Sequence, residues 1–163
     1  NPGQLLRELC KKIKGTIHIQ QNNGLDILHE LSTRILESIK YSKGKTDINT
    51  TAEIAMEIGA GVCQDHTHAF ITSARLLGFS SRYVSGYLSN GINETQVATH
   101  AWAEVYIMGL GWVGFDISNG ISPDERYVRL ATGFDYADVI PISGVRIGNG
   151  EEQIKTEITF NQQ

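Results

Sequence analysis

The sequence predicts an α+β fold, with helices in the first part of the chain packed on one side of a mostly antiparallel sheet formed by the rest. Two patterns support this prediction. Apolar residues recur at helical spacing as far as about residue 77, and short β-branched and aromatic runs separated by turn residues follow. The chain has 163 residues, of which 40% are hydrophobic, and it contains no internal repeat. One domain with its own core therefore accounts for this length.

Four helices are expected, over about residues 5–14, 25–39, 51–58 and 63–77. Each of these segments has its apolar side chains on one helical face. Gly15, Gly59 and Gly78 follow three of the segments, as glycine often does at the end of a helix. Thr50 and Glu53 have the spacing of a capping box, which predicts that the third helix begins after Thr50.

Five strands are expected in the remainder of the chain, over residues 82–88, 101–108, 111–115, 127–131 and 153–160. These segments are rich in β-branched and aromatic residues, which pack well on a pleated surface. Gly109 separates the second strand from the third, so the two are expected to form an antiparallel hairpin.

The charge and the cysteine content limit the class of function. The formal net charge of −4 and the isoelectric point near 5.7 argue against nucleic acid or an anionic membrane as a partner, because both bind basic surfaces. The sequence has no run approaching the roughly 20 apolar residues that span a bilayer. Its only cysteines are Cys10 and Cys63, fewer than a small secreted disulfide scaffold carries, so a cytoplasmic location is expected.

Cys63 is the candidate nucleophile. It lies in the run Gly59-Ala-Gly-Val-Cys-Gln-Asp65, a glycine-rich turn directly before the fourth expected helix. Unpaired N–H groups and the helix dipole favour an anion in the first turn of a helix. The N–H groups of Cys63 and Gln64 are therefore candidate donors to an oxyanion. The alternative is that Cys63 is a small buried apolar residue, as free cysteines often are.

His100 and Asp116 lie in adjoining strands and are the candidate base and its orienting carboxylate. If the hairpin loop is centred on Gly109, Asp116 lies opposite Trp102 and diagonally across from His100. The two then share a face, with about 7–8 Å between their backbones. A loop of two residues would place them on opposite faces, so the proposed pairing predicts a loop of odd length.

Two aromatic residues are candidate walls of a cleft. Trp102 shares the face of His100, where it either lines the cleft or shields the ion pair from water. Tyr83, in the first expected strand, is the second candidate. The alternative for both residues is ordinary packing in the core.

Five segments together resemble the transglutaminase-like superfamily, and more narrowly a bacterial branch whose members are described as proposed cysteine proteases. The segments are Gly61-Val-Cys-Gln-Asp65, Arg82-Tyr-Val-Ser-Gly-Tyr87, His100-Ala-Trp102, Gly111-Trp-Val-Gly-Phe-Asp116 and Asp135-Tyr-Ala-Asp-Val139. The similarity extends from about residue 25 to residue 145 and depends mainly on the order of the cysteine, histidine and aspartate segments. Ile117-Ser118 departs from the Pro-Thr pair that more often follows the aspartate in this family.

The resemblance implies a papain-like α+β fold in which Cys63 is the nucleophile, His100 the base and Asp116 its orienting group. It also implies a thiol-dependent amide-bond hydrolase that acts on a protein or peptide through a thioester and needs no cofactor. Fuller members of the family carry an N-terminal β-rich domain. We therefore expect residues 1–163 to be a single catalytic domain belonging to a longer protein.

Three other functions remain open from the sequence. The same site can transfer the acyl group to an amine, as a transglutaminase does, and the exclusion of water from the thioester decides between the two reactions. The fold can also serve as a non-catalytic peptide-binding module. A dense set of side chains also suits zinc, namely Cys63, Asp65, His66, His68 and His100. His66 and His68 diverge on a helix because they are two residues apart, so we expect no metal.

Overall fold

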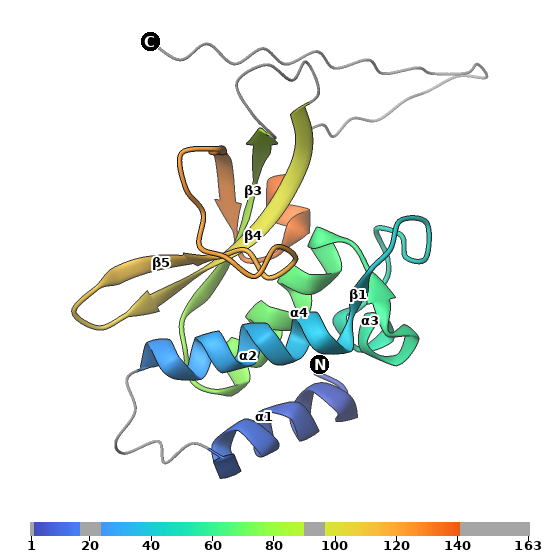
Figure 1. Ribbon diagram of the computed structural model, residues 1–163, viewed down its shortest axis with the longest axis vertical. Coiled ribbons are helices and arrows are strands. Elements are labelled where there is room, and N and C mark those ends of the chain that lie inside the picture. The colour runs from blue at the N-terminus through green and yellow to red at the C-terminus, as the bar shows by residue number, and fades with distance from the viewer. Residues whose placement is uncertain (1, 17–23, 90–96, 141–163) are drawn as a thin grey trace.

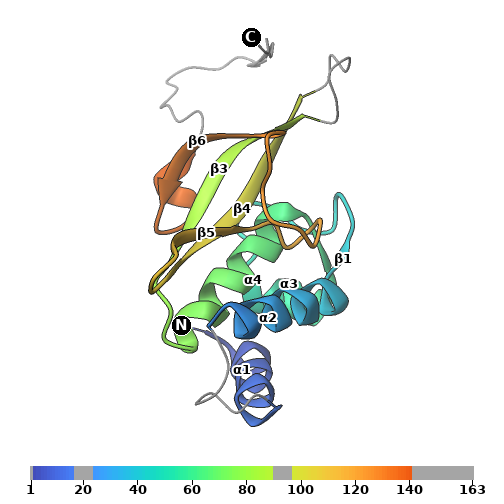
Figure 2. The same cartoon turned by 60° about the vertical axis from the view of Figure 1, so that its left-hand side comes forward.

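Helices and strands form separate regions of the molecule in a computed structural model of the chain, which describes residues 2–16, 24–89 and 97–140 (Figure 1). The helices are α1 (Gln4–Thr16), α2 (Gly24–Ser38), α3 (Ala52–Ile58) and α4 (Cys63–Leu76), with a short 3-10 helix η1 (Tyr136–Val139). One antiparallel sheet has the strand order β5-β4-β3-β6, formed by β5 (Gly111–Phe115), β4 (Val97–Ile107), β3 (Ser81–Ser89) and β6 (Tyr127–Gly133). Figure 2 shows α1 to α4 gathered on one side of this sheet, so the predicted α+β arrangement is confirmed.

The expected elements agree closely with the structure. Within the described residues every expected helix and strand is present, and the largest difference is the start of β4, at Val97 in place of residue 101. The strand expected over residues 153–160 lies outside the described residues. A parallel pair of two-residue strands, β1 (Lys40–Tyr41) and β2 (Ala60–Gly61), was not expected. Such short strands have no periodic pattern that a sequence could reveal.

The capping box expected at the start of α3 is wrong. Thr51, not Thr50, caps this helix, and its hydroxyl accepts a hydrogen bond from the N–H of Ile54. The carboxylate of Glu53 instead accepts hydrogen bonds from the N–H groups of Leu5, at 2.6 Å, and Leu6, at 3.3 Å. Glu53 therefore satisfies donors at the start of α1 rather than of its own helix, which is a tertiary contact that local spacing cannot predict.

The hairpin between β4 and β5 has the predicted odd-length loop. Ile107 pairs with Gly111 and Ala103 pairs with Phe115, which leaves three residues in the turn. Gly109 and Gly111 have φ angles of 85° and 82°, in the left-handed region that favours glycine. This register continues to place residue 116 opposite residue 102 just beyond the end of β5.

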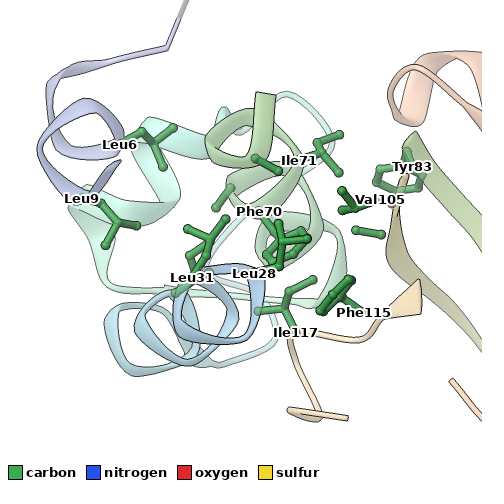
Figure 3. Close-up of a cluster of buried hydrophobic side chains, with 14 of the residues drawn as sticks. Leu6, Leu9, Leu28, Leu31, Phe70, Ile71, Tyr83, Val105, Phe115 and Ile117 are labelled. Carbon is green, nitrogen blue, oxygen red and sulfur yellow. The ribbon is translucent and has the colours of Figure 1, made fainter. Parts of the chain in front are cut away.

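The core lies around α4, which packs between the other helices and the sheet (Figure 3). Alternate residues of β4 face this helix and are buried, namely Ala101, Ala103, Val105 and Ile107. Phe70 of α4 is fully buried and contacts the ring of Phe115 at a centroid distance of 5.2 Å. The first residue of α4 and the ends of β4 and β5 are thereby fixed relative to one another. No helix in the described part of the chain is long and apolar enough to cross a membrane.

Candidate functional site

Cys63 is the first residue of α4 and directly follows the short strand pair. Val62 precedes the helix in an extended conformation, with φ −114° and ψ −176°. The side chain of Cys63 is half-buried, carries a free thiol and packs against the edge of the core. The position at the N-terminus of a helix is the one that the sequence predicted, and it favours an anion.

A buried carboxylate fixes the turn before Cys63. Asp65 accepts hydrogen bonds from the N–H of Val62 and from the hydroxyl of Thr46, each at 2.7 Å. Gly61 leaves the space that this contact needs, because a Cβ atom there would lie 2.6 Å from the Asp65 carboxylate. The segment Gly61-Val-Cys-Gln-Asp65 thus needs glycine and aspartate at its two ends in order to present Cys63.

His100 and Asp116 form the ion pair that the register predicted. The Nε2 atom of His100 lies 2.6 Å from Oδ2 of Asp116, whose side chain is almost completely buried. Three further side chains donate to the same carboxylate: the hydroxyl of Tyr127 at 2.6 Å, the amide of Asn119 at 2.7 Å and the hydroxyl of Ser118 at 2.8 Å. Burial would raise the pKa of Asp116, but these hydrogen bonds, led by that from His100, lower it to about 2.

The chain reverses immediately after Asp116, which brings two of these donors back to the carboxylate. The N–H of Asp116 donates to the carbonyl of Ile121, and Gly120 between them has a φ of 67°. Ser118 keeps a hydroxyl within reach of Asp116, so the departure from Pro-Thr at Ile117-Ser118 does not remove this contact. The carboxylate is therefore held as an anion in one orientation.

His100 interacts with Cys63 as well as with Asp116. Burial alone would lower the pKa of the imidazole, but hydrogen bonds with Asp116 and Cys63, and the charges of both groups, raise it to about 9. Because Nε2 already contacts Asp116, Nδ1 is the ring nitrogen left for the sulfur. The structure thus brings together side chains from α4, from β4 and from the residue after β5.

The aromatic candidates occupy different places. Trp102 is 2% exposed and stacks on the ring of His100, at 6.4 Å between centroids, with Tyr127 against its edge at 5.4 Å. It shields the ion pair, which is one of its two expected roles. Tyr83 is also 2% exposed and packs against His68, at 5.2 Å between centroids. Of the two expectations for Tyr83, a cleft wall or packing in the core, its burial supports packing in the core.

Three donors to Asp116 were missed in the sequence, namely Ser118, Asn119 and Tyr127. The Asn119-Gly120 pair is a turn signal that indicates a chain reversal here. Tyr127 gives no such signal, since its contact depends on how β6 lies beside β3. Gln64, expected beside the nucleophile, has a buried side-chain amide nitrogen with no hydrogen-bond partner among the described residues.

The side chains considered for zinc have other partners. Both ring nitrogens of His66 face backbone carbonyls, those of Val62 at 2.9 Å and Ile39 at 2.8 Å. The carboxylate of Asp65 accepts hydrogen bonds from Val62 and Thr46, and the ring of His68 lies against Tyr83. In the three described ranges no cluster of His, Cys, Asp or Glu residues has an arrangement suited to a metal ion.

Comparisons with known proteins agree with the resemblance found in the sequence. A model of the transglutaminase-like superfamily matches residues 11–117. An uncharacterized protein of Mycobacterium tuberculosis is 34% identical over 144 residues, which is 80% of this chain and 45% of the relative. One from Mycobacterium leprae is 32% identical over 128 residues, or 74% of this chain and 45% of the relative. The chain thus spans about half the length of the curated relatives it matches.

Two solved structures are also similar. A protein from Cytophaga hutchinsonii, described as a proposed cysteine protease, is 32% identical with a TM-score of 0.69, covering 83% of this chain and 44% of that one. A protein described as a TGase has 17% identity and a TM-score of 0.55, covering 74% of this chain and 32% of that one. The second likeness shows the fold alone.

Proposed function

Because the chain belongs to the transglutaminase-like superfamily, we propose that it is a thiol-dependent amide-bond hydrolase acting on proteins or peptides. In this proposal Cys63 is the nucleophile, His100 the base and Asp116 the group that orients the base. One observation carries it: a fixed carboxylate orients the imidazole of His100, and Cys63 lies near enough to that imidazole to help raise its pKa.

The proposed reaction passes through a thioester. His100 accepts the thiol proton, and the sulfur of Cys63 bonds to the carbonyl carbon of the amide. The bond between carbon and nitrogen then breaks, and the amine leaves with the proton from His100. A water molecule, whose proton passes to His100, attacks the thioester and releases the carboxylic acid and the thiol.

The start of α4 supplies hydrogen-bond donors for the oxyanion in this proposal. The first N–H groups of a helix have no partner within it, so those of Cys63 and Gln64 are available to an acyl oxygen. The amide nitrogen of the Gln64 side chain is a further candidate, because it is buried and lacks a partner in the described part of the chain.

Hydrolysis is favoured over transfer to an amine by the similarity to the Cytophaga hutchinsonii protein, the structure with the higher identity of the two. That protein's description as a proposed cysteine protease supports the same chemistry here. Transamidation stays the alternative within the same thioester mechanism.

Acylation by p-nitrophenyl acetate tests the proposal. The wild-type chain should release p-nitrophenolate and form a thioester on Cys63, seen by mass spectrometry of the intact protein and its peptides. Cys63→Ala should reduce the rate by roughly 1000-fold or more, because the nucleophile is lost. Cys10→Ala is the matched control and should acylate at the wild-type rate. A wild-type protein that forms no thioester would overturn the proposal.

A primary amine added to the same assay separates the two reactions. A hydrolase should release mainly acetate even with the amine present at millimolar concentration, whereas a transamidase should form the acetylated amine. Predominant acetylated amine, dependent on Cys63, would replace hydrolysis by the alternative.

A further inference from the structure

Asp116 accepts more hydrogen bonds than a carboxylate needs in order to orient an imidazole. Its Oδ2 atom accepts from Nε2 of His100 at 2.6 Å, from the hydroxyl of Tyr127 at 2.6 Å and from the side-chain amide of Asn119 at 2.7 Å. Its Oδ1 atom accepts from the hydroxyl of Ser118 at 2.8 Å and from the N–H of Asn119 at 3.2 Å. A carboxylate has about four lone-pair sites, two on each oxygen. The three donors to Oδ2 therefore compete for the oxygen that holds His100.

Tyr127 differs from the other neutral donors in its place in the fold. Those donors belong to the turn after Asp116, whereas Tyr127 begins β6, which lies beside β3 on the side away from β4 (Figure 2). The N–H of Tyr127 donates to the carbonyl of Asp124 at 3.0 Å, and the carboxylate of Asp124 is paired with Arg126 at 2.6 Å. The hydroxyl thus reaches Asp116 from a separate strand, so its removal leaves the hydrogen bonds of the turn in place.

Two aromatic contacts fix the ring of Tyr127. It lies against the edge of Trp102, at 5.4 Å between centroids and an interplanar angle of 83°, and its centroid is 5.9 Å from that of His100. Trp102 also stacks on His100, so the three rings pack together around the ion pair. Because phenylalanine keeps the ring, Tyr127→Phe keeps this packing and removes the hydroxyl alone.

The groups that act on His100 come from different parts of the fold. Burial lowers the pKa of His100, but Asp116 after β5 and Cys63 at the start of α4 raise it, to about 9. Gly86, its partner in β3, carries no charge. Burial and the hydrogen bond to Asp116 raise the pKa of Tyr127, so the phenol stays protonated and remains a donor. Tyr127 therefore acts on the imidazole as a neutral group, through the carboxylate that both contact.

A hydrogen bond to a carboxylate transfers part of the negative charge to the donor. Oδ2 of Asp116 therefore attracts the proton of His100 less strongly with the Tyr127 hydroxyl present than without it. An acid whose pKa lies far above the working pH gives up its proton slowly, so a limit on the strength of the ion pair favours proton transfer to a leaving group.

We propose that Tyr127 is a positioning residue, whose hydroxyl takes up part of the charge on Asp116 and so eases transfer of the His100 proton to the leaving group. The inference rests on the proposed function, since it assigns a role in that reaction. In the step concerned, the bond between the acyl carbon and the leaving atom breaks, and the bonding pair and the proton of His100 both go to that atom. The acyl group stays on the Cys63 sulfur, and the imidazole becomes neutral.

An NMR titration of the histidine ring protons, with His100 assigned through His100→Gln, tests the coupling. Tyr127→Phe should raise the pKa of His100 and move its titration midpoint upward by roughly half a pH unit or more, because Oδ2 loses a donor. A residue that only packs against the ion pair would have the opposite effect, since its loss loosens the pair. The same change made in Asp116→Asn protein should leave the midpoint where it is, because the tyrosine acts through the carboxylate.

Two acetate esters test the role in the reaction. Phenyl acetate and p-nitrophenyl acetate give the same thioester on Cys63, but phenolate is the more basic leaving group and depends more on the His100 proton. Tyr127→Phe should therefore slow acylation by phenyl acetate roughly two- to fivefold more than acylation by p-nitrophenyl acetate. Tyr106→Phe is the matched control, because Tyr106 is 49% exposed and contacts Trp112 at the β4–β5 hairpin; its His100 titration and both rates should equal those of wild type.

The other outcomes overturn the proposal. An unchanged or lower pKa of His100 in Tyr127→Phe shows that the hydroxyl does not limit the ion pair. A shift that persists in Asp116→Asn protein shows that it does not act through the carboxylate, and an equal loss with both esters shows that it does not affect the leaving group. The titration needs no substrate. A wild-type protein that forms no thioester therefore overturns the proposed function and the role in the reaction, while the titration still decides whether Tyr127 and His100 are coupled. Circular dichroism of each variant checks that the fold is kept.

Discussion

Cys10 and Cys63 differ in everything that surrounds their sulfur atoms. Cys10 lies within α1, is buried, and its sulfur contacts the carbonyl oxygen of Ser73 at 3.6 Å. Burial raises the pKa of this thiol more than the Ser73 contact and the charge of Lys14 lower it. Cys63 begins a helix, is half-buried and helps to raise the pKa of His100. The contrast shows that the neighbouring side chains and the position in the helix, rather than the residue type, decide which thiol can act as a nucleophile.

The largest expected effect is the difference in alkylation between the two cysteines. At pH 6.5 iodoacetamide should modify Cys63 roughly 100-fold or more faster than Cys10, because Cys63 is half-exposed at a helix start beside His100, whereas Cys10 is buried and burial raises its pKa. His100→Ala should remove most of this difference in labelling rate. Peptide mass spectrometry of timed samples measures both rates.

Urea-unfolded protein provides the control for this comparison, since both cysteines should then react at one rate. Equal labelling of the two cysteines in the folded protein would contradict the idea that His100 activates Cys63. A His100→Ala variant whose Cys63 is labelled at the wild-type rate would contradict it as well.

The contrast between these cysteines could be predicted from the sequence because it depends on local patterns. The glycine-rich turn before Cys63 and the apolar spacing after it are short-range signals, and the structure has the helix start at this residue. The pairing of His100 with Asp116 followed from the parity of one hairpin loop, which the register confirms. Periodicity and turn chemistry therefore predicted most of the fold and the order of the site.

What the sequence did not reveal depends on contacts between distant segments. Glu53 caps α1 across 48 residues instead of its own helix, and Tyr127 reaches Asp116 from another strand. Tyr83 was a cleft candidate with core packing as its alternative, and it is buried because β3 is central in the sheet and its inward face is covered. The two-residue strand that holds Tyr41 is too short for any periodic pattern. Such features arise from packing, which a single sequence does not encode locally.

The next effect in size concerns the carboxylate behind His100. Asp116→Asn should lower the pKa of His100 from about 9 towards its ordinary value, because the strongest stabilisation of the imidazolium is lost. It should also slow acylation of Cys63 by about 100-fold, the lower end of what a positioned general base contributes, while Cys10 is unaffected. An NMR titration of the histidine ring protons, with His100 assigned through His100→Gln, measures the pKa directly. If the pKa of His100 were the same in Asp116→Asn as in wild type, the ion pair with Asp116 would not be the cause of the raised pKa.

The same pair makes stability depend on pH with a definite sign. The pKa of His100 is raised on folding, so its contribution is complete below about pH 6.5 and is lost as the pH rises through about 9. The pKa of Asp116 is lowered, so its contribution is present above about pH 4 and is lost as the pH falls through about 2. Urea unfolding of wild type and Asp116→Asn at pH 5.5 and 9.5 measures this. The difference in unfolding free energy between the two proteins should be larger at pH 5.5.

The smallest expected effect tests whether the faster labelling of Cys63 than of Cys10 depends on how Gly86 and Trp102 pack against His100. Gly86 pairs with His100 across β3 and β4, and the ring of Trp102 crosses over it. A Cβ atom at Gly86 would lie 2.2 Å from the carbonyl oxygen of Val128 and 2.6 Å from the Trp102 ring, and the backbone oxygen cannot easily move. Gly86→Ala should therefore lower the free energy of unfolding by about 1–3 kcal/mol. It should also reduce the Cys63 labelling advantage severalfold, because Trp102 shields the ion pair.

Gly15→Ala is the matched control for this change. Gly15 lies near the end of α1, where a Cβ atom would meet nothing within 4 Å, so alanine should raise the free energy of unfolding by about 0.5–1 kcal/mol. Labelling of Cys63 should not change, because α1 is remote from His100 in the sheet. If Gly86→Ala lost stability but kept the full labelling advantage, the ion pair of His100 with Asp116 would be sufficient without the indole beside it. The reactivity of Cys63 would then depend on hydrogen bonding alone rather than on the exclusion of water from the pair.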